Sequence, residues 1–320
     1  MDIGVVLRNF GGFPETGRGP RACVDLAIEA DRLGFPAVWV TDHVVLPEHR
    51  RAAYPHNASG SFPYRWDEDI YDPLALMAAL ATATHTVEIG VAVLVIPYRH
   101  PLVVAKSLST IDQLAGGRVI LGAGVGWLFD EFEALGLPEE VFAHRGGVTE
   151  DHLRAMKAAW TADGAASYEG RHVRFSGVGT YPRPARRPSI PVWIGGKGDQ
   201  ALRRAARIGD GYLAIASGPV LLAAEVNRLR GLAEAQARDP DELAVALIDG
   251  IVVTEQPLGR DRAVLSGNAE QILTDLAAFA AAGLHHLVAG TRRRGESSLA
   301  ATVEVLEQLS SEVLPDARAL

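Results

Sequence analysis

The chain has 320 residues, of which 48% are hydrophobic and 22% charged, and its formal net charge is −8. This composition is that of a globular chain with a large core, and the charge excludes a general attraction to nucleic acid or anionic lipid. The single cysteine excludes an intrachain disulfide and a cysteine-rich metal site, and it fits a reducing compartment.

No segment has the character of a targeting or membrane sequence. The run from Asp2 to Leu7 is short and lacks a basic region or a cleavage pattern, and the most hydrophobic stretch, residues 87–97, is interrupted by Glu88. A bilayer-spanning helix needs about 20 apolar residues. We therefore expect a soluble, cytoplasmic protein that binds neither membrane nor nucleic acid.

Short β-branched runs alternate along the chain with longer amphipathic segments. Eight runs are predicted strands: Ile3–Leu7, Ala37–Thr41, Val87–Val93, Val119–Ala123, Pro191–Gly195, Gly211–Ala216, Ala244–Val253 and His286–Ala289. Helices are predicted between and after them: Arg21–Leu33, Pro73–Thr84, Pro101–Leu114, Trp127–Trp160 with a break near Pro138, Gln200–Ile208, Val220–Ala237, Asn268–Ala282 and Ser298–Leu314.

The strands are apolar throughout rather than alternating, which is typical of parallel strands covered on both faces. Eight such β/α units predict an α/β fold, a TIM barrel of the (β/α)8 type formed by residues 1–320 as a single domain. An open doubly wound sheet would carry a G-x-G-x-x-G turn after its first strand, and the segment from Arg8 to Gly12 lacks that spacing.

Two insertions interrupt this alternation. Residues 164–188, before the fifth strand, contain a predicted hairpin at Ala166–Phe175. Residues 43–69, after the second strand, carry four aromatic side chains: Tyr54, Phe62, Tyr64 and Trp66. Because the loops that follow the strands form the active face of a barrel, we expect this aromatic insertion to be a lid or a substrate wall, with Trp66 a candidate substrate contact.

The segment Thr41-Asp42-His43 ends the second strand, where catalytic side chains of a barrel belong. A histidine can act as acid or base near neutral pH, and the neighbouring carboxylate of Asp42 could orient it or raise its pKa. The alternative is that His43 caps the strand by hydrogen bonding to loop backbone.

Two glycine-rich segments follow the fourth and fifth strands. Gly122, Gly124 and Gly126 would let the backbone approach a flat ligand ring, or they form a tight turn. The run Gly195-Gly196-Lys197-Gly198 precedes a helix, whose amino-terminal amides attract phosphate. A rival anion site is the arginine run at Arg292 after the eighth strand, which could equally be a solvated loop.

Other chemistries lack their signatures. The sequence has no H-x-x-x-H or H-x-H pair with nearby carboxylates and no G-x-S-x-G segment, so neither a metal site nor a serine hydrolase is expected.

Several of these segments together resemble the luciferase-like monooxygenase family. They are Val119–Trp127 with Glu131–Gly136, the segment from Arg145 to Trp160, Pro191–Gly196, Ala201–Ala206 and Gly209–Tyr212. The resemblance runs from Ile3 to about Val288. Asp42-His43, the strand at Ile89–Pro97 and the run from Gly126 to Phe132 are most similar to the F420-dependent branch of that family.

The resemblance implies that a flavin or deazaflavin ring binds at the barrel mouth. It implies a non-proline cis peptide at Ala92-Val93, a cofactor phosphate at Gly195-Gly196, and His43 near the reactive ring carbon as a proton donor or acceptor. Trp127 stands where F420-dependent sugar-phosphate dehydrogenases have an acidic glutamate, so we expect an aromatic-walled pocket rather than a sugar-phosphate site.

The sequence thus predicts an F420-dependent oxidoreductase that transfers a hydride to or from an organic small molecule, with His43, Asp42 and Trp127 as candidate catalytic residues and Arg292 and Trp66 facing substrate. The family further implies a homodimer. The alternatives are an FMN-dependent monooxygenase that uses reduced flavin and O2, and a non-catalytic flavin-binding barrel.

Overall fold

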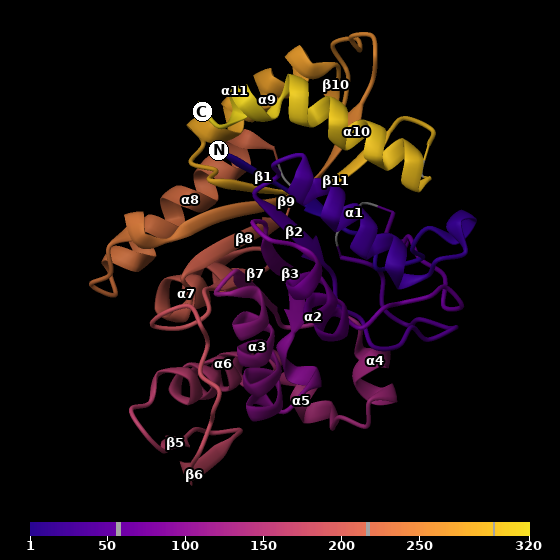
Figure 1. Cartoon of the computed structure of the whole chain (residues 1–320). Helices are drawn as coiled ribbons and strands as arrows, with labels where there is room; N and C mark the ends of the chain where they lie inside the picture. Colours follow the sequence, from indigo (N-terminus) through magenta and orange to yellow (C-terminus); the bar gives the residue numbers. More distant parts are fainter. Residues whose placement is uncertain (56–58, 216–217, 297) are drawn as a thin grey trace.

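Eight parallel strands close into a barrel in the computed structural model, which describes residues 1–55, 59–215, 218–296 and 298–320 (Figure 1). The barrel strands are β1 (Asp2–Val6), β2 (Ala37–Val40), β3 (Glu88–Val95), β4 (Val119–Gly124), β7 (Val192–Gly195), β8 (Gly211–Ile215), β9 (Ala244–Val253) and β11 (His286–Arg293). The pairing of β8 with β9 closes the ring, and the two-residue β10 (Ser266–Gly267) pairs in parallel with the last two residues of β9. The predicted (β/α)8 barrel is confirmed, while Ala216 of the sixth predicted strand lies outside the described residues.

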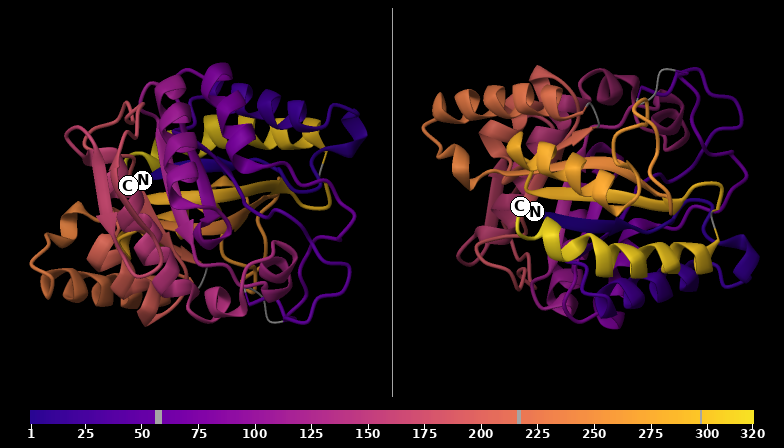
Figure 2. Two further views of the ribbon diagram at one scale, coloured as in Figure 1. Left: turned by 90° about the horizontal axis from the view of Figure 1, so that it is seen from below. Right: turned by 90° about the horizontal axis from the view of Figure 1, so that it is seen from above.

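Helices surround the strands in all three views of the molecule (Figures 1 and 2). They are α1 (Pro20–Arg32), α2 (Pro73–Ala83), α3 (Pro101–Ala115), α4 (Phe129–Ala134), α5 (Glu139–Ala143), α6 (Arg145–Thr161), α7 (Asp199–Ile208), α8 (Pro219–Glu234), α9 (Ala269–Ala281), α10 (Leu299–Glu312) and α11 (Leu314–Ala317). None of the helices formed by the described residues is both long and apolar enough to cross a membrane.

The long helical segment predicted at Trp127–Trp160 is divided into α4, α5 and α6. Gly136 has φ +70°, a left-handed conformation that ends a helix, and Pro138 then precedes the first residue of α5. The break expected near Pro138 is therefore confirmed, and a second break at His144 separates α5 from α6.

The interior of the barrel is filled by large side chains around Trp39, which contacts Trp193 and His286. The Trp39 indole Nε1 donates to His286 Nε2 at 3.1 Å. Two glycines make room for this indole, because a Cβ on Gly4 or Gly90 would lie 2.4 Å and 2.1 Å from Trp39 atoms. The barrel interior around Trp39 is thus a packed core rather than a channel.

The buried His286 ring should make stability depend on acid. Desolvation lowers the pKa of His286 from 6.5 to about 4. The unfolded chain therefore binds a proton more readily, so stability is complete above pH 6.5 and declines as the pH falls toward 4. At pH 5 the loss from this one group should be about 2 kcal/mol, measured by urea unfolding. His286→Gln keeps an acceptor for Trp39 and should flatten this dependence; an unchanged slope would assign it to other groups.

Two insertions stand outside the barrel, as the sequence predicts. The described residues between β2 and α2 form loop with one isolated bridge, Phe10 to Ile70. The hairpin of β5 (Ala166–Glu169) and β6 (Arg174–Val178) confirms the second insertion. Asp151 of α6 holds this hairpin, because its carboxylate accepts from the Tyr168 hydroxyl and the His172 backbone N–H, both at 2.6 Å.

Candidate active site

The third barrel strand bulges where the resemblance predicts it. The Ala92–Val93 peptide bond is cis, and the register between β3 and β4 shifts between Val91 and Leu94. Ala92 packs on the barrel interior beside Trp39. The bulge therefore forms a ledge near the carboxyl ends of the strands, the end of a barrel that carries its active site.

The glycines of β4 and β7 pack against this ledge. A Cβ on Gly124 would lie 2.4 Å from Val93 Cγ2, and a Cβ on Gly195 would lie 2.5 Å from Val93 Cγ1. A Cβ on Gly122 would come within 2.2 Å of the Val91 carbonyl oxygen. These glycines consequently admit the Val93 side chain between two neighbouring strands. Gly126, at φ +79°, forms the tight turn that leads from β4 toward α4.

His43 lies beyond the end of β2 and is bound by a carboxylate from α4. Its Nδ1 is 2.6 Å from Glu131 Oε2, and Glu131 is fully buried. Glu131 Oε1 accepts from the Val44 backbone N–H at 2.6 Å. An acceptor in this position favours the imidazole proton on Nδ1, which leaves Nε2 free for proton exchange with a ligand.

The Tyr98 hydroxyl completes this arrangement by donating to Glu131 Oε2 at 2.8 Å. Burial, together with the Glu131 carboxylate, raises the pKa of Tyr98 far above its ordinary value, so the hydroxyl stays protonated and remains a donor. Glu131 and Tyr98 escaped the sequence reasoning because neither is near His43 in the chain.

Asp42 has a different set of partners from its neighbour His43. Arg99 binds its carboxylate with two hydrogen bonds, at 2.7 Å and 2.8 Å, and the Val95 backbone N–H donates to it at 2.9 Å. The carboxylate in contact with His43 is therefore Glu131. Asp42 instead ties the end of β2 to the end of β3.

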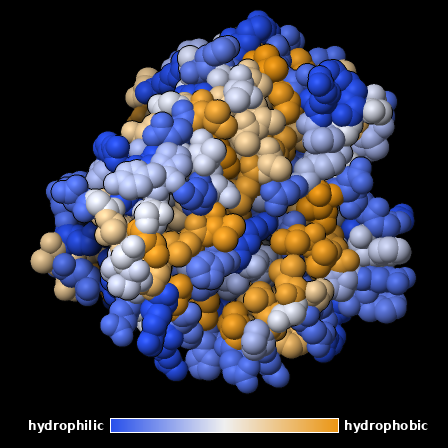
Figure 3. Space-filling view, turned by 60° about the horizontal axis from the view of Figure 1, so that its bottom comes forward, coloured by the Kyte–Doolittle hydropathy of each residue, from blue (hydrophilic) through white to orange (hydrophobic). Residues whose placement is uncertain are grey.

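Aromatic side chains cover His43. Its ring centroid lies 5.3 Å from Phe10, 5.4 Å from Phe62 and 6.3 Å from Trp127. Trp66 is 51% exposed, outside this cluster. On the face drawn in the space-filling view, hydrophobic side chains gather in patches between hydrophilic ones (Figure 3).

A hollow of about 480 Å³ opens beside Gly195, Gly196 and Lys197. Arg204 of α7 lines it, is only 8% exposed, and has a buried Nε without a hydrogen-bond partner. Desolvation lowers the pKa of this guanidinium. Glu150, which also lines the hollow, attracts this guanidinium, but desolvation outweighs the attraction, so a further anion in the hollow would stabilise Arg204. Gly198, at φ +75°, is the N-cap of α7.

The arrangement of α6 explains how Arg204 comes to lie there. A Cβ on Gly146 would be 2.6 Å from Arg204 Nη2, so the lack of a side chain at Gly146 leaves room for the guanidinium in this orientation. Sequence reasoning missed Arg204, since it is one arginine of an amphipathic helix and nothing near it in the chain marks it as buried.

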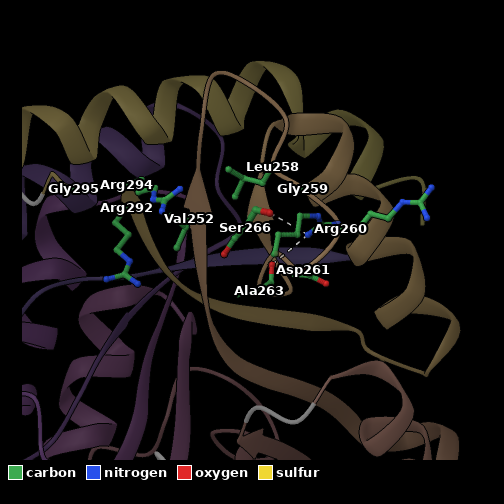
Figure 4. A pocket seen from close by; sticks show the side chains of 11 residues that line it. Val252, Leu258, Gly259, Arg260, Asp261, Ala263, Ser266, Arg292, Arg294 and Gly295 are labelled. Carbon is green, nitrogen blue, oxygen red and sulfur yellow. Dashed lines mark hydrogen bonds between the residues drawn. The ribbon is translucent and has the colours of Figure 1, made fainter.

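Arg292 and Arg294 line a second hollow, of about 630 Å³ (Figure 4). The eighth strand continues past its predicted end at Ala289, so Arg292 belongs to β11 and not to a loop after it. Arg292 and Arg294 contribute to its wall and are exposed, and the close-up shows Arg260 extending away from the other labelled side chains. Arg262 is already bound, to Asp275 at 2.5 Å and to the Ser266 carbonyl at 3.0 Å. The two anion-site candidates from the sequence therefore belong to separate hollows.

The described residues contain no group of three or more His, Cys, Asp or Glu side chains placed to hold a metal ion.

Comparison with known proteins places the chain in a family. The model for the luciferase-like monooxygenases matches residues 1–264. An uncharacterized protein of Mycobacterium tuberculosis strain H37Rv is 33% identical over 215 residues, which are 67% of this chain and 72% of the relative. An F420-dependent glucose-6-phosphate dehydrogenase of Amycolatopsis mediterranei is 31% identical over 196 residues, 61% of this chain and 53% of the relative.

Among solved structures, an F420-dependent secondary alcohol dehydrogenase in complex with an F420-acetone adduct superimposes with a TM-score of 0.79 at 19% identity, covering 99% of both chains. At that identity the likeness shows the fold alone. The family match over most of the chain shows more: this protein belongs to the luciferase-like monooxygenase family of oxidoreductase enzymes.

Proposed function

We propose that this protein is an F420-dependent oxidoreductase that transfers a hydride between the deazaflavin and an organic small-molecule substrate. The observation that carries the proposal is the histidine on a buried carboxylate, His43 on Glu131, near the ledge at Ala92–Val93. Relatives named as F420-dependent dehydrogenases support the deazaflavin as the cofactor.

The residues present fit such a cofactor. Arg204, Lys197 and the backbone at Gly195-Gly196 would hold its phosphate, which would give the buried Arg204 Nε the acceptor that it lacks. The ledge at Ala92–Val93 would support its ring. A side chain larger than glycine at Gly124 or Gly195 would displace Val93 and disturb that support.

When bound, the deazaflavin supplies the hydride chemistry. The protein supplies the proton group and the surroundings. His43 Nε2 would give or take a proton, while Glu131 orients the ring by accepting from Nδ1. Phe10 and Trp127 would exclude water from the reacting atoms.

A fluorescence titration of the purified protein with F420 and with FMN tests the cofactor. We expect F420 to bind at least about tenfold tighter, a difference of about 1.4 kcal/mol. Equal affinities or a preference for FMN would favour the monooxygenase alternative. Tight binding without steady-state turnover on any organic substrate would favour the non-catalytic barrel.

A further inference from the structure

Phe62 occupies the centre of the aromatic cluster over His43. Its ring centroid lies 5.0 to 6.3 Å from those of five other rings: Phe10, His43, Tyr54, Tyr64 and Trp127. Its neighbours Ser61 and Pro63 are exposed, whereas Phe62 is half-buried. The chain thus directs this one side chain of the local loop toward the histidine.

The rings around Phe62 differ in how they are held. Phe10 is 3% exposed and its backbone bridges to Ile70, and Trp127 follows the tight turn at Gly126. Phe62 lies in a segment without helix or strand. Phe62 and Trp127 both contact His43 from segments without helix or strand, and Phe62 is the one that comes from the long insertion after β2.

The ring of Phe62 covers part of the His43 ring. The His43 side chain is 11% exposed, and Phe10, Phe62 and Trp127 all meet its ring edge to face. These three rings leave little of the imidazole surface open to a ligand. Displacing Phe62 would open a flat slot between His43, Tyr54 and Trp127.

Arg50 adds a polar feature to this slot. Its guanidinium carbon lies 5.1 Å above the centroid of Phe62, and its Nη2 donates to the Tyr64 carbonyl at 3.1 Å. Its Nη1 is buried and has no hydrogen-bond partner. An unmet donor on the guanidinium that covers the ring marks a place for a ligand oxygen.

We propose that Phe62 holds the place of the substrate ring, and that the site takes a planar conjugated carbonyl compound whose oxygen accepts a hydrogen bond from Arg50. This inference rests on the proposed function for the chemistry that follows binding. The aromatic surroundings select a flat, apolar ring by stacking, and the single unmet donor selects one oxygen acceptor.

The reaction on such a substrate balances. The reduced deazaflavin, when bound, would supply a hydride to the β-carbon and lose two electrons. Arg50 would stabilise the negative charge that forms on the carbonyl oxygen as the π-electron pair moves toward it. His43 Nε2 would pass a proton to the α-carbon and regain one from solvent, which completes the reduction of the C=C bond.

Chemical labelling tests whether Phe62 covers His43, with no cofactor present. Diethyl pyrocarbonate acylates free imidazole nitrogens, and mass spectrometry measures the rate at each histidine. Phe62→Ala should raise the rate at His43 at least about fivefold, because access no longer waits for local opening. The rate at the exposed His85 reports an intact fold and should not change. Tyr181→Ala, which removes an exposed ring elsewhere, should match the wild type at both. An unchanged rate at His43 in Phe62→Ala would overturn the proposal.

A pair of matched ligands tests the substrate class by protection of His43 from the same reagent. Chromone is a planar bicyclic conjugated ketone, and naphthalene is a planar bicycle without oxygen. Chromone should protect wild type, and about tenfold more tightly in Phe62→Ala, since the competing ring is gone. Arg50→Met should weaken chromone about tenfold and leave naphthalene unchanged.

Equal effects of Arg50→Met on both ligands, or no protection by chromone, would refute the assignment. Neither experiment contains a cofactor, so its failure leaves the F420 titration standing, and a failed titration leaves these results standing.

Discussion

His43→Ala is expected to lower kcat by about 10² to 10⁴ while cofactor affinity stays within about threefold. The substitution removes the only imidazole in contact with Glu131 among the described residues and leaves the ledge and the anion hollow intact. Stopped-flow and steady-state rates on one substrate measure the effect, and a cofactor titration measures affinity.

Two variants sharpen this result. Glu131→Gln keeps the size of the side chain but takes the charge from the hydrogen bond that orients His43 through Nδ1, so a loss of about 10 to 10² in kcat is expected. His49→Ala makes the same change at an exposed histidine of the same insertion and should behave as wild type. Near-normal turnover in His43→Ala would reduce His43 to a residue that caps its strand.

Arg204→Met should weaken cofactor binding about 10²-fold, or roughly 2 to 3 kcal/mol, because hydrogen bonds from a buried guanidinium to an anion are strong. The same variant without ligand should unfold at a higher temperature, because the desolvation of a guanidinium whose Nε has no acceptor outweighs its attraction to Glu150. Opposite signs in these two measurements distinguish an anion-binding arginine from one that stabilises the helix.

Variants at the two hollows decide between the anion sites. Gly196 has φ +144° and a Cβ there would lie 3.0 Å from the Ala201 Cβ, so Gly196→Val should also weaken the cofactor, by about 1 kcal/mol or more. Arg292→Met should leave the cofactor Kd unchanged and affect only KM. A loss of cofactor confined to Arg292→Met would move the phosphate to the second hollow.

The barrel can be predicted from the sequence because the residues that define each strand and helix are close together in the chain. Each strand is a short apolar run, and each is bounded by a turn or a helix start within a few residues. The hairpin before β7 follows the same logic and is found where expected, although β6 ends three residues later, at Val178. The cis bond at Ala92–Val93 was accessible only through the family resemblance, since no local pattern of residues demands it.

The side chains that complete the site depend on contacts between distant segments. Glu131 reaches His43 across 88 residues, and the Arg204 guanidinium lies against Gly146 of a different helix. Asp42 shows the converse case, in which two residues that are adjacent in the chain have side chains with different partners. Adjacency to His43 in the chain suggested that it orients the ring, yet its carboxylate points to Arg99 and to the Val95 backbone.

The hydrogen bonds from Arg99 and the Val95 backbone to Asp42 fix the end of β2 to the end of β3. His43 follows Asp42 directly, and the ledge at Ala92–Val93 lies two residues before Val95, so the same contact positions both the proton group and the support for a ring. A shift of the ledge would therefore be accompanied by a shift of His43. Because a misplacement of about 1 Å can slow catalysis about 10²-fold, this contact would keep the imidazole aligned with a bound ring during thermal motion of the loops.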